Sequence, residues 1–413
     1  MNSKMKFVGN WGRLGMKFNI WEDCPKVPIT ELLSFIVDNR GKTVPTANDG
    51  WKLIATNCVT NNTLFPVYEK VRYLTQETYE TWFRAHPMPG DILFVNKGTP
   101  GRVCMVPDPV DFCIAQDMIA LRADDKKIYN KYLFAVLRSR EIQQQIYNTN
   151  VGDVIPHFKK QFMDQLLIPV PDRKIQEKIG NLYYQLSYKV ELNKKINENL
   201  EQQAQAIFAQ EFLNRSSIPD GWKVGSLLDI ADYLNGLAMQ KFRPSDDEIG
   251  LPVLKIKELR QGSCDSSSEL CSPSIKPAYI IHDGDVIFSW SGSLLVDFWC
   301  GGTCGLNQHL FKVTSQKYDK WFYYAWTKHH LDRFIAVAAD KATTMGHIKR
   351  EELAKADILI PNSADYSRIG SLLQPMYDLI IANRIENKKL AEIRDSLLPK
   401  LMCGEIDISE IDC

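Results

Sequence analysis

Hydrophobic residues in the middle and near the end of the chain follow the spacing of long amphipathic helices. After the sequence IPVPD, apolar residues recur close to a heptad period from Ile179 to Ile207, and Asp172 is a suitable N-cap for this helix. The same spacing runs from Ile369 to Leu397. Helices of about forty residues extend about 60 Å, which is more than one globular core needs. The pattern therefore predicts that the two helices cover each other's apolar faces.

A different pattern precedes each long helix, in which short apolar runs are separated by glycine and proline. The runs DILFV (91–95), LPVLKI (251–256) and DVIFSW (285–290) predict strands. Helical spacing follows in the stretches 131–148 and 320–338. Each long helix is thus expected to follow a mixed α/β globular domain.

The whole pattern occurs twice along the chain. YNKYLFAVLRS begins at Tyr129 and YDKWFYYAWTK at Tyr318, while IGNLYYQLSYKVELNKKINENL begins at Ile179 and IGSLLQPMYDLIIANRIENKKL at Ile369. An offset near 190 holds through the long helices, and PGDILFVNKG matches DGDVIFSWSG with a slightly larger offset. The chain is therefore interpreted as a tandem duplication of a unit of about 190 residues.

These patterns predict an α+β fold. It consists of a tandem duplication of an α/β domain plus a long helix, with the two helices packed as an antiparallel coiled coil with pseudo-two-fold symmetry. The expected divisions are a first domain at 1–171, a central helix at 172–215, a second domain at 216–362 and a C-terminal helix at 363–413.

Asn193 and Asn383 occupy equivalent positions on the apolar seam of the two predicted helices. They are interpreted either as polar residues at solvated heptad sites or as buried residues that fix the register of the helices at some cost in stability. The spacing favours neither interpretation.

Composition narrows the class of protein. The chain has 413 residues, enough for two or three domains, with 45% hydrophobic and 24% charged residues. Basic and acidic residues number 50 each, which argues against nonspecific coating of nucleic acid but allows a basic surface on one face. No apolar run is long enough to span a membrane, and the first residues lack a secretory apolar core. A cytoplasmic location is expected.

A search of the sequence for catalytic motifs gives little support for an enzyme. The sequence contains no Walker A motif, no glycine-rich dinucleotide fingerprint and no HExxH zinc motif. The second half contains Cys264, Cys271, Cys300 and Cys304, which could form a zinc site of a hydrolase, but their spacing is looser than in common zinc sites. Buried thiols are the simpler interpretation, and no metal site is predicted.

Three stretches resemble a known family. RDSLLPKLMCGEI (394–406), TTMGHIKREEL (343–353) and IPVPDRKIQEKI (168–179) are similar to sequences at the corresponding places of the specificity (S, or HsdS) subunits of type I restriction–modification systems. The second junction, IPNSADYSRI (360–369), departs from this pattern and has no matching glutamine. The resemblance covers roughly residues 25–406 and includes the tandem layout.

The resemblance implies a non-catalytic subunit that binds double-stranded DNA. Each globular domain would be a target-recognition domain that reads one half of an interrupted target. The helices would set the spacing and dock two modification (methyltransferase) subunits, which use S-adenosylmethionine. Restriction (translocase/nuclease) subunits using ATP and Mg would join them, and no cofactor is expected in this chain. The alternative is a duplicated coiled-coil scaffold for protein partners without DNA specificity.

Candidate DNA contacts are polar and basic residues on loops that follow strands, because base edges need hydrogen-bonding groups and phosphates need cations. For any one of them, a surface or turn position is the simpler interpretation. In the first domain they are Lys97, Thr99, Arg102, Gln116, His157, Lys159 and Lys160. In the second they are Ser289, Ser291, Ser293, Asn307, Gln308, His309, Lys341, Thr343, Thr344, His347, Lys349 and Arg350.

Overall fold

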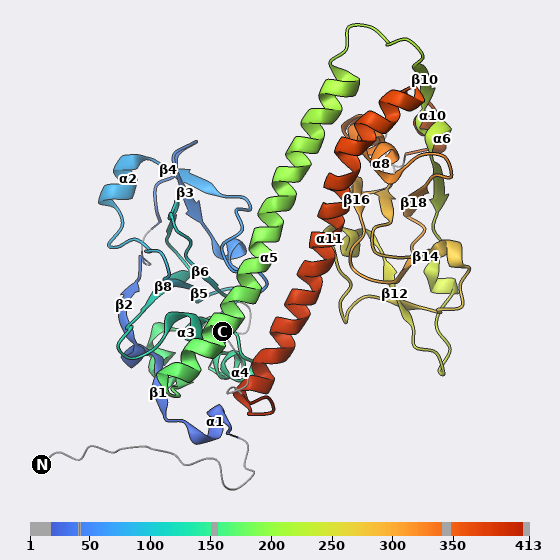
Figure 1. Cartoon of the computed structure of the whole chain (residues 1–413). Helices are drawn as coiled ribbons and strands as arrows, with labels where there is room; N and C mark the ends of the chain where they lie inside the picture. The colour runs from blue at the N-terminus through green and yellow to red at the C-terminus, as the bar shows by residue number, and fades with distance from the viewer. Residues whose placement is uncertain (1–17, 40, 42, 150–155, 341–347, 408–413) are drawn as a thin grey trace, which may run out of the picture. The chain divides into compact units, whose positions relative to one another are not determined.

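The computed structural model describes residues 18–39, 41, 43–149, 156–340 and 348–407 (Figure 1). The chain packs into two compact units, one made of residues 1–191 and 389–413 and the other of residues 192–388. Each unit contains one globular domain and one part of each of two long helices, α5 (Arg173–Phe208) and α11 (Ser363–Met402). No helix in the described part of the chain is both long enough and apolar enough to cross a membrane.

The globular domain of the first unit is built from three small sheets. A four-stranded antiparallel sheet has the order β2-β8-β5-β6, and a three-stranded sheet has the order β4-β3-β7 with β3 and β7 parallel. The antiparallel pair β1-β9 joins the two ends of the domain. The strands are β1 (Lys26–Pro28), β2 (Leu33–Val37), β3 (Trp51–Ile54), β4 (Arg72–Leu74), β5 (Ile92–Val95), β6 (Val103–Met105), β7 (Phe112–Ile114), β8 (Met118–Ala123) and β9 (Leu167–Pro169). The helices are α1 (Ile20–Asp23), α2 (Gln76–Thr81), α3 (Asn130–Leu137) and α4 (Arg140–Asn148).

The domain of the second unit repeats this topology. Its four-stranded sheet has the order β11-β18-β15-β16, its second sheet the order β13-β12-β17-β14 with β12 and β17 parallel, and β10 pairs with β19. The strands are β10 (Lys223–Ser226), β11 (Asp232–Asn235), β12 (Leu251–Leu254), β13 (Leu270–Cys271), β14 (Ile280–Ile281), β15 (Val286–Ser289), β16 (Leu295–Phe298), β17 (Cys304–Leu306), β18 (Leu310–Thr314) and β19 (Asp357–Ile360). The helices are α6 (Leu227–Ile230), α7 (Ile256–Gln261), α8 (Lys320–His329), α9 (Leu331–Asp340) and α10 (Arg350–Ala354). The predicted tandem duplication and mixed helix and sheet content are confirmed.

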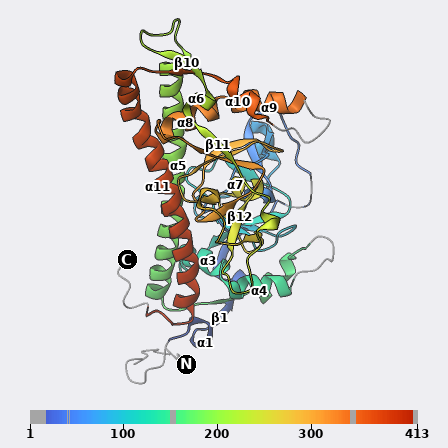
Figure 2. The same cartoon turned by 90° about the vertical axis from the view of Figure 1, so that its right-hand side faces the viewer.

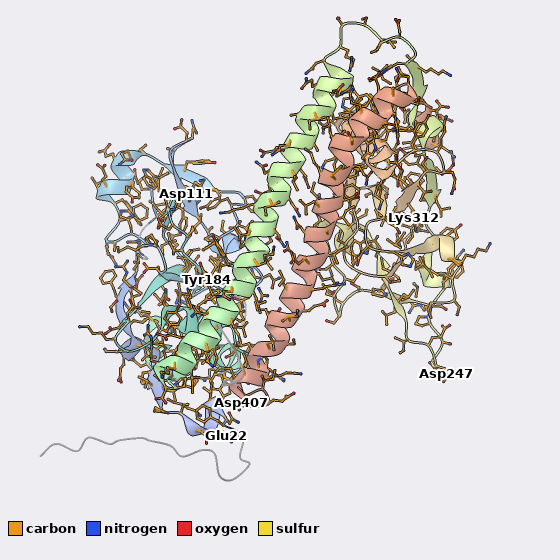
Figure 3. The ribbon with its side chains drawn as sticks, in the orientation of Figure 1. Glu22, Asp111, Tyr184, Asp247, Lys312 and Asp407 are labelled. Carbon is orange, nitrogen blue, oxygen red and sulfur yellow. The ribbon has the colours of Figure 1, made fainter. Side chains whose placement is uncertain are left out.

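The central strands β5 and β15 are buried along their whole length, and an aspartate precedes each of them. Asp91 and Asp285 each accept a hydrogen bond from the main-chain N–H three residues earlier, which closes a turn before the strand. Each carboxylate also pairs with a cation of the neighbouring strand, at 2.9 Å from Arg122 in the first unit and 2.8 Å from Lys312 in the second. Lys312 is labelled among the side chains of the second unit in Figure 3. Both copies therefore keep the aspartate before the central strand, but the cation that pairs with it comes from a different position of the neighbouring strand in each copy.

Apolar side chains of the two long helices pack against each other within each unit. In the first unit, Ile179 and Tyr183 of α5 share a core with Leu398 and Leu401 of α11. In the second unit the shared core includes Phe208, Ile369, Leu373 and Tyr377. Residue numbers rise along α5 while they fall along the facing part of α11, so the segments run antiparallel in each unit (Figures 1 and 2).

Two asparagine pairs lie inside this helix contact in the second unit. Asn193 donates to the Oδ1 of Asn387 at 2.8 Å, and Asn383 donates to the Oδ1 of Asn197 at 2.8 Å. Asn193 is 0% exposed, and Asn197 and Asn383 are both 7% exposed. The interpretation as solvated heptad positions is therefore wrong, because the amides are buried and bonded across the two helices. Register-fixing is the interpretation that fits this geometry.

The start of each long helix is tied to the shorter helix that precedes it. The buried Gln176 side chain accepts the N–H of Tyr129, the N-cap residue of α3, at 2.8 Å. In the second unit the hydroxyl of Tyr366 accepts the N–H of Asp319, the N-cap residue of α8, at 2.7 Å. The second junction lacks a glutamine, and a tyrosine performs the same capping.

A glycine about two turns into each long helix allows a second close contact with the same short helices. A Cβ built on Gly180 would lie 2.5 Å from the main-chain nitrogen of Tyr132, and one on Gly370 would lie 3.0 Å from the Nε1 atom of Trp321. Both glycines occupy equivalent positions of the duplication. The contact of Gly180 is with main-chain atoms and that of Gly370 is with a side chain. The two positions should therefore differ in how well they tolerate a larger residue.

We predict that Gly180→Ala destabilises the first unit by about 1–3 kcal/mol, the typical cost of overpacking a tight contact. Gly370→Ala is the matched control, and we expect a smaller loss because the indole of Trp321 can shift by a few tenths of an ångström. Chemical denaturation followed by circular dichroism measures both changes. Equal losses for the two variants would contradict the backbone-contact explanation.

Candidate nucleic-acid interface

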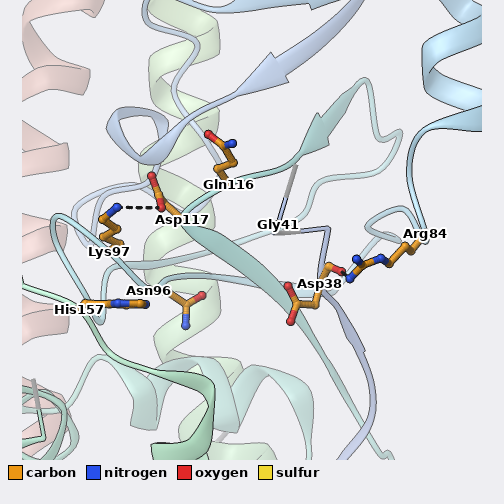
Figure 4. A pocket seen from close by; sticks show the side chains of 8 residues that line it. All are labelled: Asp38, Gly41, Arg84, Asn96, Lys97, Gln116, Asp117 and His157. Atoms are coloured by element: carbon orange, nitrogen blue, oxygen red, sulfur yellow. Dashed lines mark hydrogen bonds and ion pairs between the residues drawn. The ribbon is translucent and has the colours of Figure 1, made fainter. Parts of the chain in front are cut away.

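A polar groove of about 570 Å³ lies at the end of β5 in the first unit (Figure 4). It brings together the loop after β2, the β5–β6 turn, the β7–β8 turn and the segment that follows α4. Its lining residues are Asp38, Gly41, Arg84, Asn96, Lys97, Gln116, Asp117 and His157.

Main-chain hydrogen bonds hold the walls of this groove together. The N–H groups of Asn96 and Lys97 donate to the carbonyl oxygen of Asp117 at 2.8 and 3.3 Å, and the Asn96 carbonyl accepts the N–H of Phe158 at 2.8 Å. Asp117 has a φ of 67°, the left-handed conformation that aspartate tolerates better than most residues, and it makes a tight turn into β8. Three segments far apart in the sequence are therefore fixed around one opening.

Cations and hydrogen-bond acceptors alternate along the rim of this groove. The Nζ atom of Lys97 lies 4.0 Å from Asp117 Oδ1, and that of Lys160 lies 3.5 Å from Asp38 Oδ2. Lys97 and Lys160 are 43% and 55% exposed, so these ion pairs contribute little to stability and can be exchanged for other partners. Arg84 is exposed as well. Such a rim can bind phosphates while the uncharged polar groups contact base edges.

The second unit has a groove of about 610 Å³ at the equivalent place. The main-chain link is the same, since the N–H of Ile348 donates to the carbonyl of Trp290 at 3.0 Å, as Phe158 does to Asn96. The lining differs, because aromatic rings replace most of the polar groups. It consists of Tyr233, Leu234, Asn235, Tyr279, Trp290, Phe311, Ile348, Lys349 and Arg350.

The base of the aromatic groove is built from uncharged side chains that contact one another or the residues behind them. The indole N–H of Trp290 donates to Asn235 Oδ1 at 3.0 Å, and its ring centroid lies 5.5 Å from that of Phe311. The Tyr233 hydroxyl lies 2.7 Å from Thr327 Oγ1, and burial raises the pKa of Tyr233 so that it stays protonated. This floor offers apolar surface, while its cations, Lys349 and Arg350, are exposed.

The structure brings together some of the residues that the sequence predicted for the first domain. Lys97, Gln116 and His157 line the groove, and Lys160 reaches its rim through the contact with Asp38. Three others are outside the lining, with Thr99 and Arg102 in the β5–β6 turn and Lys159 exposed at the start of the following helical turn.

The predicted residues of the second domain fall into three groups. Lys349 and Arg350 line the groove. A second group forms hydrogen bonds within the domain. Ser289 donates to the carbonyl of Ser293 at 2.8 Å. The other contacts are made to His309, whose N–H donates to Asn307 Oδ1 at 3.2 Å and whose ring nitrogens lie 3.0 Å from the Ser291 hydroxyl and 3.3 Å from Gln308 Nε2. The remaining predictions, Lys341, Thr343, Thr344 and His347, lie outside the described residues.

Sequence reasoning missed three groove residues that stand out in the structure, Arg84, Asn96 and Trp290. Asn96 and Trp290 occupy equivalent positions, each directly after a completely buried central strand. The sequence signal for both was their position directly after a predicted buried strand. Arg84 lies in a loop whose sequence carries no pattern that would indicate a groove residue.

The cysteines of the second domain are free thiols. Within the described ranges, no group of three or more histidine, cysteine, aspartate or glutamate side chains is arranged to hold a metal ion.

Comparison with known proteins identifies the family. The family model of the type I restriction modification DNA specificity domain matches residues 26–202 and again residues 219–395. The chain belongs to this family. It carries two copies of the DNA specificity domain, and its function is DNA sequence recognition in a type I restriction–modification system rather than catalysis.

Individual relatives of this specificity family are distant in sequence. The MjaIX specificity subunit of Methanocaldococcus jannaschii is 26% identical over 309 residues, covering 69% of this chain and 71% of the relative. The HindI specificity subunit of Haemophilus influenzae is 20% identical over 409 residues, covering 77% and 86%. The crystal structure of the type I restriction–modification S subunit from M. genitalium matches 94% of this chain and 98% of that one, with a TM-score of 0.58 and 14% identity. This structural similarity concerns the fold. The predicted resemblance is confirmed, and a scaffold without DNA specificity is not supported.

If the groove cations bind phosphates, removing one should reduce the salt dependence of DNA binding. We predict that Lys349→Gln lowers the slope of log affinity against log salt concentration by about 0.9, the value for one released counterion. Lys223→Gln is the control, because Lys223 is exposed on β10 outside the groove lining. Fluorescence anisotropy at several salt concentrations measures the slopes. An unchanged slope for Lys349→Gln would remove this residue from the interface.

Proposed function

We propose that the two grooves are the DNA-reading surfaces, and that each reads one half of an interrupted target in double-stranded DNA. The observation that supports this most strongly is that one site occurs at the same place in both domains, with the same main-chain link but unlike linings. A conserved frame with unlike side chains is expected when two homologous domains read different base sequences. The proposed DNA-binding residues are those that line the grooves or reach their rims, namely Lys97, Gln116, His157, Lys160, Lys349 and Arg350. The other contacts predicted from the sequence stay predictions.

The proposed division assigns target-recognition domains to residues 1–171 and 216–362. Residues 172–215 and 363–413 then form the central and C-terminal spacer helices, which set the distance between the half-sites. The buried asparagine pairs support this role, because a spacer needs one fixed register.

The proposed protein partners are two modification subunits, adenine methyltransferases that use S-adenosylmethionine, and restriction subunits that use ATP and Mg. The chain itself supplies no cofactor in this proposal, and the complex works in the cytoplasm. Exposed apolar residues on α11 support docking along the helices. Leu372 and Leu379 are 44% and 45% exposed and lie seven residues apart, on one face.

Exchange of one domain tests the division of labour. We predict that replacing residues 1–171 with the corresponding domain of a relative changes one half of the target and leaves the other half and the spacer unchanged. Sequencing of methylated sites in cells that carry the modification subunits measures all three. A change in both halves would contradict the two-reader proposal.

Shortening both helices tests the spacer. We predict that deleting residues 188–191 together with residues 389–392 shortens the spacer between half-sites by about two base pairs, since four residues span about 6 Å. Continuing the antiparallel pairing of Asn193 with Asn387 places these two segments opposite each other, and neither contains the exposed leucines proposed for docking. The half-sites themselves should stay the same. Methylated-site sequencing again measures the result, and thermal unfolding of the variant is the control for its integrity. An unchanged spacer in a folded variant would refute this role of the helices.

A further inference from the structure

One polar atom in the first groove lacks the partner that buried groups normally have. Asn96 is 0% exposed, and its Oδ1 atom has no hydrogen-bond partner among the described residues. A buried acceptor without a partner has lost its hydrogen bonds to water and gained none in return, so unpaired groups of this kind call for an explanation. Asn96 also lines the groove, which gives this acceptor a direction in which a partner can come (Figure 4).

The orientation of the Asn96 amide is fixed by its other half. Its Nδ2 atom donates to the main-chain carbonyl of Phe158 at 3.2 Å, inside the protein. The carbonyl oxygen of Phe158 can only accept, so the amide cannot be flipped without placing two acceptors against each other. The Oδ1 atom of Asn96 is therefore presented as a hydrogen-bond acceptor and not as a donor.

Neighbouring side chains give this part of the groove an acceptor character. The carboxylates of Asp38 and Asp117 line the same opening as Asn96. In the major groove of DNA, guanine presents two acceptors and thymine one acceptor and a methyl group, whereas adenine N6 and cytosine N4 present donors. An acceptor-rich surface therefore disfavours guanine and thymine and can accept hydrogen bonds from the exocyclic amino groups of adenine and cytosine.

We propose that Asn96 is a specificity-determining residue of the first domain, whose Oδ1 accepts a hydrogen bond from the exocyclic amino group of an adenine or cytosine in the first half-site. This inference rests on the proposed function of the groove as a DNA-reading surface. It adds the chemical group that the groove selects and the atom that selects it.

Access to this atom requires movement of the rim and not of the fold. Asn96 is buried, whereas Lys97 and Gln116, which line the same groove, are partly or fully exposed. Lys97 faces Asp117 at only 4.0 Å, and a DNA phosphate can replace this carboxylate as its partner. In this proposal, the rim side chains rearrange when the DNA backbone binds, and the acceptor becomes accessible to a base.

The experiment removes single amino groups from the DNA. The specificity subunit is assembled with its modification subunits, and its target is mapped by methylated-site sequencing. Duplexes are then prepared in which each adenine of the first half-site is replaced by purine, or each cytosine by 2-pyrimidinone, one at a time. We expect about a tenfold loss of affinity at one position, which corresponds to one lost hydrogen bond that leaves an acceptor unpaired.

Protein variants assign that loss to Asn96. In Asn96→Ala, affinity for the natural duplex should fall about tenfold, and the amino-free duplex should bind no worse than the natural one. The matched control is Trp290→Ala, at the equivalent position of the second domain, which should leave discrimination in the first half-site unchanged. Continued reading of the second half-site by Asn96→Ala verifies that this variant is folded.

Two results would overturn the inference. The first is that the wild-type complex binds every amino-free duplex as tightly as the natural one. The second is that Asn96→Ala still distinguishes the natural duplex from the amino-free one, in which case the Asn96 acceptor binds only a buried water. Failure of the proposed function is a separate result, since removal of the rim cations Lys97 and Lys160 would then leave the affinity of the complex for its target unchanged.

Discussion

The buried hydrogen bonds between asparagines of the two long helices are the constraint on which the arrangement of the second unit depends. Apolar side chains alone would let α5 and α11 slide by a turn at modest cost, because leucine, isoleucine and methionine can replace one another in such a seam. A slid register would break the hydrogen bonds from Asn193 to Asn387 and from Asn383 to Asn197. The amides of Asn193, Asn197 and Asn383 are buried, so each of their groups left without a partner would cost about 1–3 kcal/mol. Within the second unit the two helix segments can therefore pair in one way, and the globular domain of that unit packs on them in that register.

Each globular domain is attached to its helix by several independent contacts. The strand pairs β1-β9 and β10-β19 join the ends of the domains, and the caps from Gln176 and Tyr366 bind the short helices α3 and α8 to the long ones. In the second unit, Arg384 of α11 adds a hydrogen-bonded ion pair to Asp297 of β16 at 2.6 Å and another to Glu201 of α5 at 2.9 Å. The walls of each groove are thus built on a frame whose position relative to its own helices is over-determined.

The sequence predicts the frame well and the site poorly, for physical reasons. Helical spacing and the repeat depend on many residues, so a change such as glutamine to tyrosine at the second junction does not hide them. The groove depends on single side chains that converge from distant segments, and their residue types alone do not tell a reading group from a turn. Ser289 illustrates this difficulty, since it follows the pattern of a reader but is completely buried and holds its own turn. Asn96 illustrates the opposite case. Its position after a predicted strand does not distinguish it from a turn residue, and its proposed role depends on two structural facts, the hydrogen bond from its Nδ2 atom to Phe158 and the lack of a partner for its Oδ1 atom among the described residues.

The duplicated asparagines also bear on how such a chain could arise. Asn193 and Asn383 are equivalent residues of the two repeats, as are Asn197 and Asn387, so the two interhelical bonds are one contact made twice with the repeats exchanged. A contact of this kind is self-complementary, like the interface of a symmetric homodimer. A single repeat would carry both halves of it, and two copies of a half-length ancestor could pair through the same helix face around a palindromic site. Fusion of two such genes would let each domain diverge without requiring a new interface.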